Sequence, residues 1–394
     1  TKKVTFITDV DKISFDVEAG KTYDFIIQKG DVMCYTQIKA NELNFWNDKD
    51  FWQSPTMKTP FSPNISDTEK IAGLAKFWSE AKYNFINFHL VPDLDWDKTY
   101  LEFIPKVLAT KSTLEYYRVL QMFCKKLGDG HTNVFMPNEL ADEVFRRPAI
   151  ITQLVENKVV IIRLLDEKQK NEDLAVGQEI TEIDGIPVKK YAEEIVLPYI
   201  SESTPQAFET RVYQFDLLNG ALTKPIELTI KDTKGNSFIK TLPRLSASER
   251  SKLATPRPPF EMTMLPNNVA HVKVNTMVDE GKADQLFAQN FAEISKADTL
   301  ILDLRENGGG SSGIGYRILA FLVDTPFKQS KWMTREYHPT FRPWGRPDKA
   351  YGDEKAFEHT LESIKKMRGE NVQPFLKPVI VLSSPRTGSA AEDF

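Results

Sequence analysis

The sequence predicts a multidomain α/β protein, and three observations lead to that prediction. The chain has 394 residues, more than one ordinary hydrophobic core accommodates. Residues 139–246 show short alternating strands and turns, as in a β-rich module. From Val269 onward strands alternate with helices, which implies a mainly parallel sheet. We therefore expect four domains, at residues 1–60, 61–138, 139–246 and 247–394.

Net charge, the length of apolar runs and the cysteine count exclude several classes of protein. The net charge is −4 with acids and bases mixed, so no basic face indicates nucleic acid as a partner. No apolar run approaches the roughly 20 residues of a membrane-spanning helix. Cys34 and Cys124 make neither a disulfide framework nor a metal cluster, and we expect two buried thiols. The first residues lack the apolar core of a signal peptide, but Thr1 is not a start methionine, so targeting stays open.

The first two domains differ in pattern. Residues 12–20 and 21–31 alternate apolar and polar side chains around an Ala-Gly turn, which predicts a small β domain. In the second domain, Ser66–Glu69 and Ser112–Glu115 fit capping boxes that open amphipathic helices. We expect the second of these helices to end at the glycine of the segment GDGHT, before a short strand over residues 132–136.

The third domain is predicted as strands with a single helix. Residues 159–164 and 176–183 read as strands, the second followed by a tight Asp-Gly turn. One helix is expected from about Lys189 to Leu197. Residues 225–244 read as a hairpin that turns at Lys234–Asn236.

The fourth domain begins after a proline-rich linker, residues 255–268. The predicted elements are then a strand, a helix, a second strand, a glycine-rich loop and a second helix. After an irregular insertion, the strand PVIVLSS leads into the closing residues TGSAAEDF.

Ser389 is the first candidate for chemistry. It follows a buried strand, near a helix N-terminus, where unpaired N–H groups can stabilise an oxyanion. The placement is similar to a nucleophile elbow, although Ala391 replaces the second glycine of Gly-x-Ser-x-Gly. On this stretch alone, an N-capping serine is the simpler interpretation.

The glycine run Gly308–Gly310 is the second candidate. Its glycines suit close backbone approach or positive φ angles. Residues 308–313 also satisfy G-x-G-x-x-G, but three polar residues precede the first glycine, and the acid Asp324 follows a helix rather than a strand. A flexible loop is the alternative. Asp303 and Arg305 share a strand face and are expected to form a structural ion pair.

His131 is the third candidate. Glycine and threonine flank it on a loop held between two predicted elements, which sets it apart from the other four histidines. A lone histidine is more often structural than catalytic. A general base active near neutral pH is nevertheless what Ser389 needs to act as a nucleophile.

Four motifs together carry a resemblance to a known family. They are Asp129–Thr132 (DGHT), Val176–Gly185 (VGQEITEIDG), Leu304–Gly310 (LRENGGG) and Thr387–Glu392 (TGSAAE). In order and wording they resemble the tail-specific, or C-terminal processing, serine peptidases, a family that includes the tricorn core protease. The match runs from about residue 66 to the end, and the first two domains resemble the bacterial branch that keeps the histidine.

The resemblance implies a fold and a set of roles. It implies a crotonase-like (ClpP-like) α/β peptidase core behind a PDZ-like module, with no metal and no cofactor. Ser389 would be the nucleophile and His131 its general base. The N–H group of Ala390, with that of Gly308 or Gly309, would form the oxyanion hole.

Two departures from the family pattern affect these roles. Gly130 stands where the tricorn-like arrangement has a serine, so Asp129 or a water would have to orient His131. The remaining catalytic residue of the family, a lysine or a glutamate, lies downstream of the nucleophile. We therefore expect that the sequence is truncated at its C-terminal end.

The resulting expectation is a serine endopeptidase that acts on unfolded or C-terminally exposed polypeptides. The resemblance places it in the periplasm or cell envelope. The PDZ-like module would capture peptide by strand addition, or would serve only as a spacer. Two alternatives remain: a non-catalytic peptide- or lipophile-binding protein on the same fold, as with the retinoid-binding members, and a nucleotide-binding enzyme that uses the glycine loop. The oligomeric state stays open.

Overall fold

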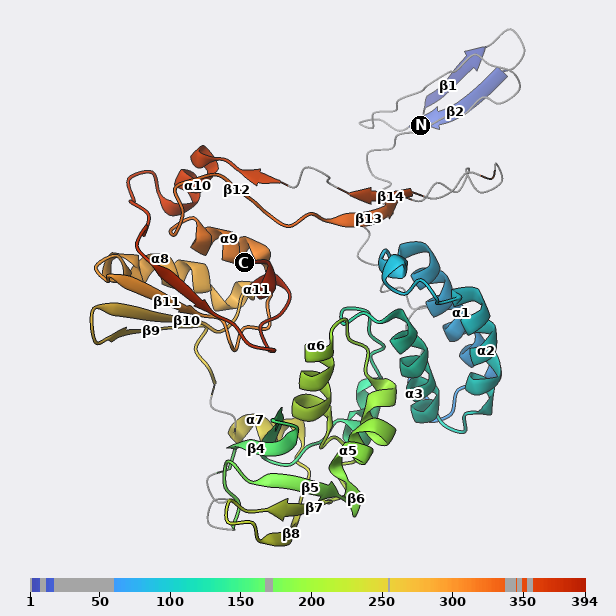
Figure 1. Ribbon diagram of the computed structural model, residues 1–394. Helices are drawn as coiled ribbons and strands as arrows, with labels where there is room; N and C mark the ends of the chain where they lie inside the picture. Colours follow the sequence, from blue (N-terminus) through green and yellow to red (C-terminus); the bar gives the residue numbers. More distant parts are fainter. Residues whose placement is uncertain are drawn as a thin grey trace. The chain divides into compact units, whose positions relative to one another are not determined.

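The computed structural model describes residues 2–7, 12–17, 60–166, 173–253, 256–336, 345, 349–352 and 357–394 (Figure 1). The chain divides into two units, residues 1–61 and 62–394. In the first, β1 (Lys2–Ile7) pairs antiparallel with β2 (Lys12–Val17). The strand expected over 21–31 lies outside the described residues, as does Cys34. No helix among the described residues has the length and hydrophobicity to cross a bilayer.

The second unit opens with three helices, α1 (Asp67–Asn84), α2 (Trp96–Ala109) and α3 (Thr113–Cys124). Ser66 and Glu69 complete the expected capping box, and Ser112 accepts the Glu115 N–H. A short 3-10 turn, Lys125–Leu127, follows α3 and ends at Gly128 with φ 59°. The predicted strand over 132–136 is wrong: this segment is an extended loop without strand pairing.

The third predicted domain forms an antiparallel sheet in the order β3-β4-β5-β7-β8. Two helical segments accompany this sheet, whereas the sequence predicted one. The first begins with α5 (Val188–Tyr191) and continues to Tyr199. The second begins with α6 (Pro205–Thr210) and continues to Asp216. The missed helix has an N-cap, Thr204, followed by a proline at its first position. The strands are β3 (Ile150–Val155), β4 (Lys158–Leu164), β5 (Glu179–Ile183), β6 (Ile186–Pro187), β7 (Ile226–Lys231) and β8 (Ser237–Leu242).

The fourth predicted domain contains a sheet in the order β16-β11-β10-β9. The strands β10 (Val269–Val274), β11 (Thr299–Asp303) and β16 (Val379–Leu382) are parallel, as predicted. The predicted linker instead contains a strand, β9 (Phe260–Leu265), which pairs antiparallel with β10. The helices α8 (Ala283–Ile294) and α9 (Ser312–Leu319) cover one face of this sheet (Figure 1).

The remaining strands and α-helices are short. They are β12 (Phe327–Lys328), β13 (Met333–Glu336), β14 (Lys349–Gly352), β15 (Glu358–His359), and the helices α4 (Ala141–Val144), α7 (Ala247–Leu253), α10 (Leu361–Arg368) and α11 (Ala390–Asp393). The second unit has three main apolar cores, one for the three helices, one for the antiparallel sheet and one for the parallel sheet.

Candidate active site

The carboxyl ends of β11 and β16 bring two loops together. The strands are parallel neighbours, and their ladder continues with the Leu304 N–H donating to the Leu382 carbonyl at 2.8 Å. The glycine loop follows the first strand and the turn that carries Ser389 follows the second. Crevices at the carboxyl ends of parallel strands are where α/β folds usually bind ligands.

Side chains of the serine turn fasten it to the glycine loop. The Thr387 hydroxyl donates to the Leu304 carbonyl at 2.9 Å, and the Ser384 hydroxyl donates to the Arg305 carbonyl at 2.6 Å. Two loops far apart in the sequence are therefore held as one unit.

Asn307 completes this connection and was not recognised as a separate site residue from the sequence. Its side chain is fully buried, its amide donates to the Val274 carbonyl at 3.0 Å, and its amide oxygen accepts the Gly309 N–H at 2.9 Å. Its carbonyl accepts the Gly388 N–H at 3.1 Å. The only signal in the sequence is an amide residue directly before a glycine run.

Two glycines of the run are required by close packing. A Cβ on Gly309, with φ 99°, would lie 2.7 Å from the Ser389 Cβ and 2.6 Å from the Gly388 carbonyl oxygen. A Cβ on Gly310, with φ 138°, would lie 2.2 Å from the Met277 carbonyl oxygen. The close backbone approach predicted for this run is thus made to the protein's own chain.

Ser389 has an unusual backbone conformation, with φ 52° and ψ −126°. It directly precedes α11, yet its side chain makes no capping hydrogen bond, and the residue is exposed. The structure therefore does not support the simpler interpretation that Ser389 caps the helix. Residues held in sparsely populated φ/ψ regions cluster at functional sites.

Backbone N–H groups are available beside this serine. Ala390 is the first residue of α11, where an N–H has no carbonyl one turn earlier to bond. Within the described part of the chain, no hydrogen bond uses the N–H of Ala390 or of Gly308, whereas Asn307 occupies that of Gly309. Of the two glycines considered, Gly308 is the one with a free donor.

A charged cluster lies at the base of the glycine loop. The predicted ion pair is confirmed: two nitrogens of the Arg305 guanidinium bond the Asp303 carboxylate at 2.9 and 2.7 Å. His271 Nε2 lies 3.1 Å from the same carboxylate. The hydrogen bonds from Arg305 hold the pKa of Asp303 well below its usual range, against the opposing effect of burial. Both Arg257 and Arg386 form ion pairs with Glu306.

The loop that carries His131 is held by another segment of the chain. The Ser201 hydroxyl donates to the Asp129 carbonyl at 3.0 Å, and the Gly130 N–H donates to the Ser203 hydroxyl at 3.0 Å. Thr132 donates to the Asp129 carboxylate. His131 itself is exposed.

Glu202, which sequence reasoning missed, lies beside the glycine that precedes His131. A Cβ on Gly130 would lie 2.5 Å from Glu202 Oε2, so a side chain there would require this carboxylate to shift. Burial raises the pKa of Glu202, while the charges of Arg211 and His131 act in the opposite direction. Nothing in the local sequence connects Gly130 with a residue 72 positions later.

The structure gathers the predicted residues into two groups. Ser389, Ala390, Gly308 and Gly309 lie together, whereas His131 lies on its own loop. No hydrogen bond or ion pair between described residues joins His131 to Ser389.

Cys124 behaves as the buried thiol that was predicted. It is 2% exposed, its thiol donates to the Thr132 carbonyl at 3.1 Å, and burial raises its pKa to about 12. No group of three or more histidine, cysteine or acidic side chains suited to a metal ion occurs in the described ranges.

Comparisons with known proteins connect this site to a family. Residues 268–394 match the sequence profile of peptidase family S41. No curated protein sequence matches the chain.

Solved structures extend the likeness beyond the matched segment. Mature CPAF superposes with a TM-score of 0.57 at 14% identity, over 83% of this chain and 80% of that chain. For the photosystem II D1 C-terminal processing protease the TM-score is 0.41 at 16% identity, over 83% and 77% of the two chains. For a putative peptidase from Parabacteroides merdae it is 0.36 at 15%, over 84% and 71%. The superposition on CPAF shows a shared fold.

Proposed function

We propose that this chain, whose residues 268–394 match peptidase family S41, is a serine-type peptidase that hydrolyses peptide bonds through an acyl-enzyme on Ser389. The observation that carries the proposal is an exposed serine with a left-handed φ, beside two backbone N–H groups that form no hydrogen bond with any described residue. The substrates are unfolded or C-terminally exposed polypeptides.

The reaction begins at the serine hydroxyl. Ser389 Oγ attacks the carbonyl carbon of the scissile peptide bond while His131 accepts the hydroxyl proton. The tetrahedral intermediate then collapses, the C–N bond breaks, and the leaving amine takes the proton from His131. Water repeats the sequence on the ester, releasing the second product and restoring Ser389.

The oxyanion of each intermediate is held by the N–H groups of Ala390 and Gly308. Fixed backbone donors of this kind need no reorganisation as charge develops, and losing one typically lowers kcat by about 10²–10³-fold. The hydrogen bonds through Asn307 and Thr387 keep the two donor-bearing loops in register.

The β-rich module serves substrate capture in this proposal, and the parallel-sheet domain is the crotonase-like catalytic core. β3 is an edge strand, paired only with β4 within the described residues. An extended peptide can add to such an edge through main-chain hydrogen bonds.

A fluorophosphonate probe tests the reaction directly. The longest available form of the protein is treated with the probe, and the adduct is located by peptide mass spectrometry. We expect labelling of Ser389, its loss in Ser389→Ala, and a large decrease in His131→Ala. Ser383→Ala, which changes an exposed serine at the start of the same turn, should label normally.

Two other labelling results would change the assignment of the base or of the function. Labelling that survives in His131→Ala would assign the base role to another residue. Absence of labelling in the folded wild-type protein would contradict the peptidase proposal and favour a non-catalytic binding protein on the same fold.

A further inference from the structure

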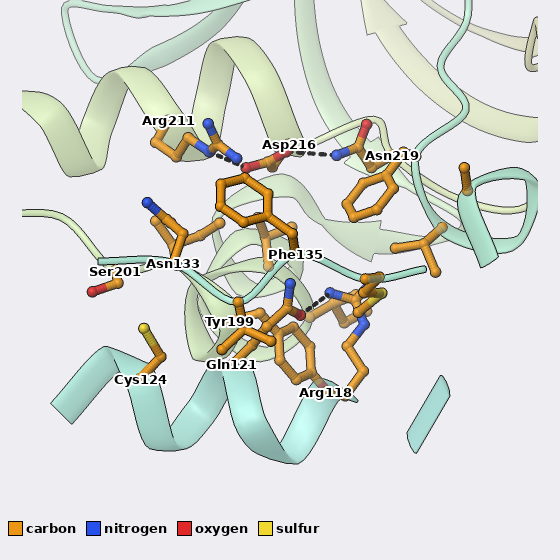
Figure 2. Close-up of a pocket in the computed structure, with 18 of the residues that line it drawn as sticks. Arg118, Gln121, Cys124, Asn133, Phe135, Tyr199, Ser201, Arg211, Asp216 and Asn219 are labelled. Carbon is orange, nitrogen blue, oxygen red and sulfur yellow. Dashed lines mark hydrogen bonds and ion pairs between the residues drawn. The ribbon is translucent and has the colours of Figure 1, made fainter. Parts of the chain in front are cut away.

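A cavity of about 360 Å³, with no lining residue from the glycine loop or the Ser389 turn, lies between α3 and the helical segments of the β-rich module (Figure 2). Its volume is in the range of small-ligand sites. The described strands contribute no lining residue, so this cavity is not the strand-addition edge of the sheet. It is formed by helices and by the extended loop that follows His131.

One wall presents an arginine that forms no ion pair with any described residue, although the charge of Asp216 acts on it. Arg118 has five N–H donors, and the one hydrogen bond found for it among the described residues goes to Gln121 Oε1 at 3.1 Å. Its guanidinium carbon lies 4.4 Å from the centroid of the Tyr199 ring. Burial lowers the pKa of Arg118. The planar group is thus held in place with donors left for a ligand.

The opposite wall carries a carboxylate that is already paired. Asp216 forms an ion pair with Arg211 at 2.6 Å. It also accepts the amide N–H of Asn219 at 2.6 Å. Figure 2 shows this pair and Asn219 across the cavity from Arg118.

The rim is apolar and open to solvent. Phe135 is 84% exposed, and Phe145 and Ile195 are 38% and 42% exposed. An aromatic side chain this exposed on an ordered loop gains stability when a ligand covers it.

We propose that this cavity binds a carboxylate that carries an apolar side chain. Arg118 would bind the carboxylate, and Phe135 with Ile195 would cover the apolar group. Two sources share this chemistry, the C-terminal residue of a polypeptide and a free N-acylated amino acid. The Arg118–carboxylate contact supplies charge-assisted hydrogen bonds, the strongest type available here.

The test is a calorimetric titration on Ser389→Ala protein, so that no peptide probe is cleaved. The probes are N-acetyl-phenylalanine, its uncharged C-terminal amide, and a hexapeptide that ends in phenylalanine with a free carboxylate. We expect the carboxylate probes to bind at least tenfold more tightly than the amide. Preference for the hexapeptide assigns the polypeptide source, and preference for the small probe assigns the free amino acid derivative.

Substitutions of residues that line the cavity test whether the probes bind there. Arg118→Gln should weaken binding at least tenfold, and Phe135→Ala, at an exposed position that does not endanger folding, should weaken it several-fold. Arg163→Gln removes an equal charge at an exposed position of β4 and should bind as before. The proposal is overturned by equal binding of amide and carboxylate, by no binding, or by equal weakening in Arg163→Gln. Because Ser389 is absent throughout, these outcomes are independent of the proposed peptidase activity.

Discussion

At the residue scale, Ser389 shows how strain is retained by its surroundings. A non-glycine residue with φ 52° and ψ −126° costs of order 1–3 kcal/mol. Its carbonyl accepts the N–H groups of Glu392 and Asp393, and the preceding Gly388 N–H is bonded to Asn307. These bonds on both sides fix a conformation that leaves the hydroxyl free of a capping role. The amino acid sequence indicated a reactive serine here, but not the backbone angles, because they depend on a loop 80 residues earlier.

Gly309 and Gly308 provide a matched pair of substitutions at this scale. A Cβ at Gly309 would overlap the Ser389 turn, whereas a Cβ at Gly308 meets no atom within 4 Å. We expect Gly309→Ala to destabilise the protein by about 1–3 kcal/mol through overpacking, and to reduce probe labelling of Ser389 more than about tenfold. Gly308→Ala should leave stability unchanged or raise it by about 0.4–1 kcal/mol. Thermal unfolding and labelling rates measure both effects, and equal destabilisation by the two substitutions would contradict this packing.

At the element scale, periodicity predicted the parallel strands and their helices well. β10 and β11 are buried on one face, and α8 and α9 carry clear apolar stripes. In β16, by contrast, Ile380 and Val381 are exposed. β9 was missed because the prolines of residues 255–268 suggested a linker, yet an edge strand tolerates flanking prolines. The strand expected over residues 132–136 has the right side chains but no partner strand, and tertiary context decides such cases.

Asp303, at the end of β11, gives a pH-dependent prediction for that element. Its pKa is held below the usual range, so its ionisation stabilises the fold above the unfolded-state pKa of about 3.9, and this contribution is lost as pH falls. Asp303→Asn should therefore lower stability by about 2 kcal/mol at pH 7, because a buried charge-assisted pair is removed. The difference from wild type should stay constant from pH 7 down to about pH 5 and narrow as the pH falls below about 4.

Denaturant unfolding at several pH values tests this prediction. Asp298→Asn, at an exposed position just before the same strand, is the control and should change stability by less than about 0.5 kcal/mol. A stability difference for Asp303→Asn that does not depend on pH would show that the carboxylate is not the stabilising group.

At the scale of the whole molecule, separate cores are joined through loops that carry polar residues. Topology alone predicts that the loops after β11 and β16 meet, because parallel neighbours end on the same edge. The surroundings of His131 were not predictable in this way. Its loop is fastened by Ser201 and Ser203, from a segment between two helices of another core, and this pairing has no periodic signature.

Glu202 lies between Ser201 and Ser203, the two residues that hold the His131 loop. A substitution of Glu202 is therefore expected to change both the stability of the fold and the labelling of Ser389. Because burial raises its pKa, the native state binds its proton more readily than the unfolded chain, so stability is lost as pH rises through the native pKa. Glu202→Gln should therefore unfold at a higher temperature than wild type at pH 7.5, with the advantage disappearing near pH 4. Glu202 also lies against Gly130, next to the proposed base His131, so the same substitution should loosen this loop and slow labelling of Ser389. Glu194→Gln, on the exposed side of the neighbouring helix, should change neither quantity. A Glu202→Gln protein that is less stable at pH 7.5 would mean that the ionised carboxylate holds the His131 loop in place, and the direction of coupling argued here would be reversed.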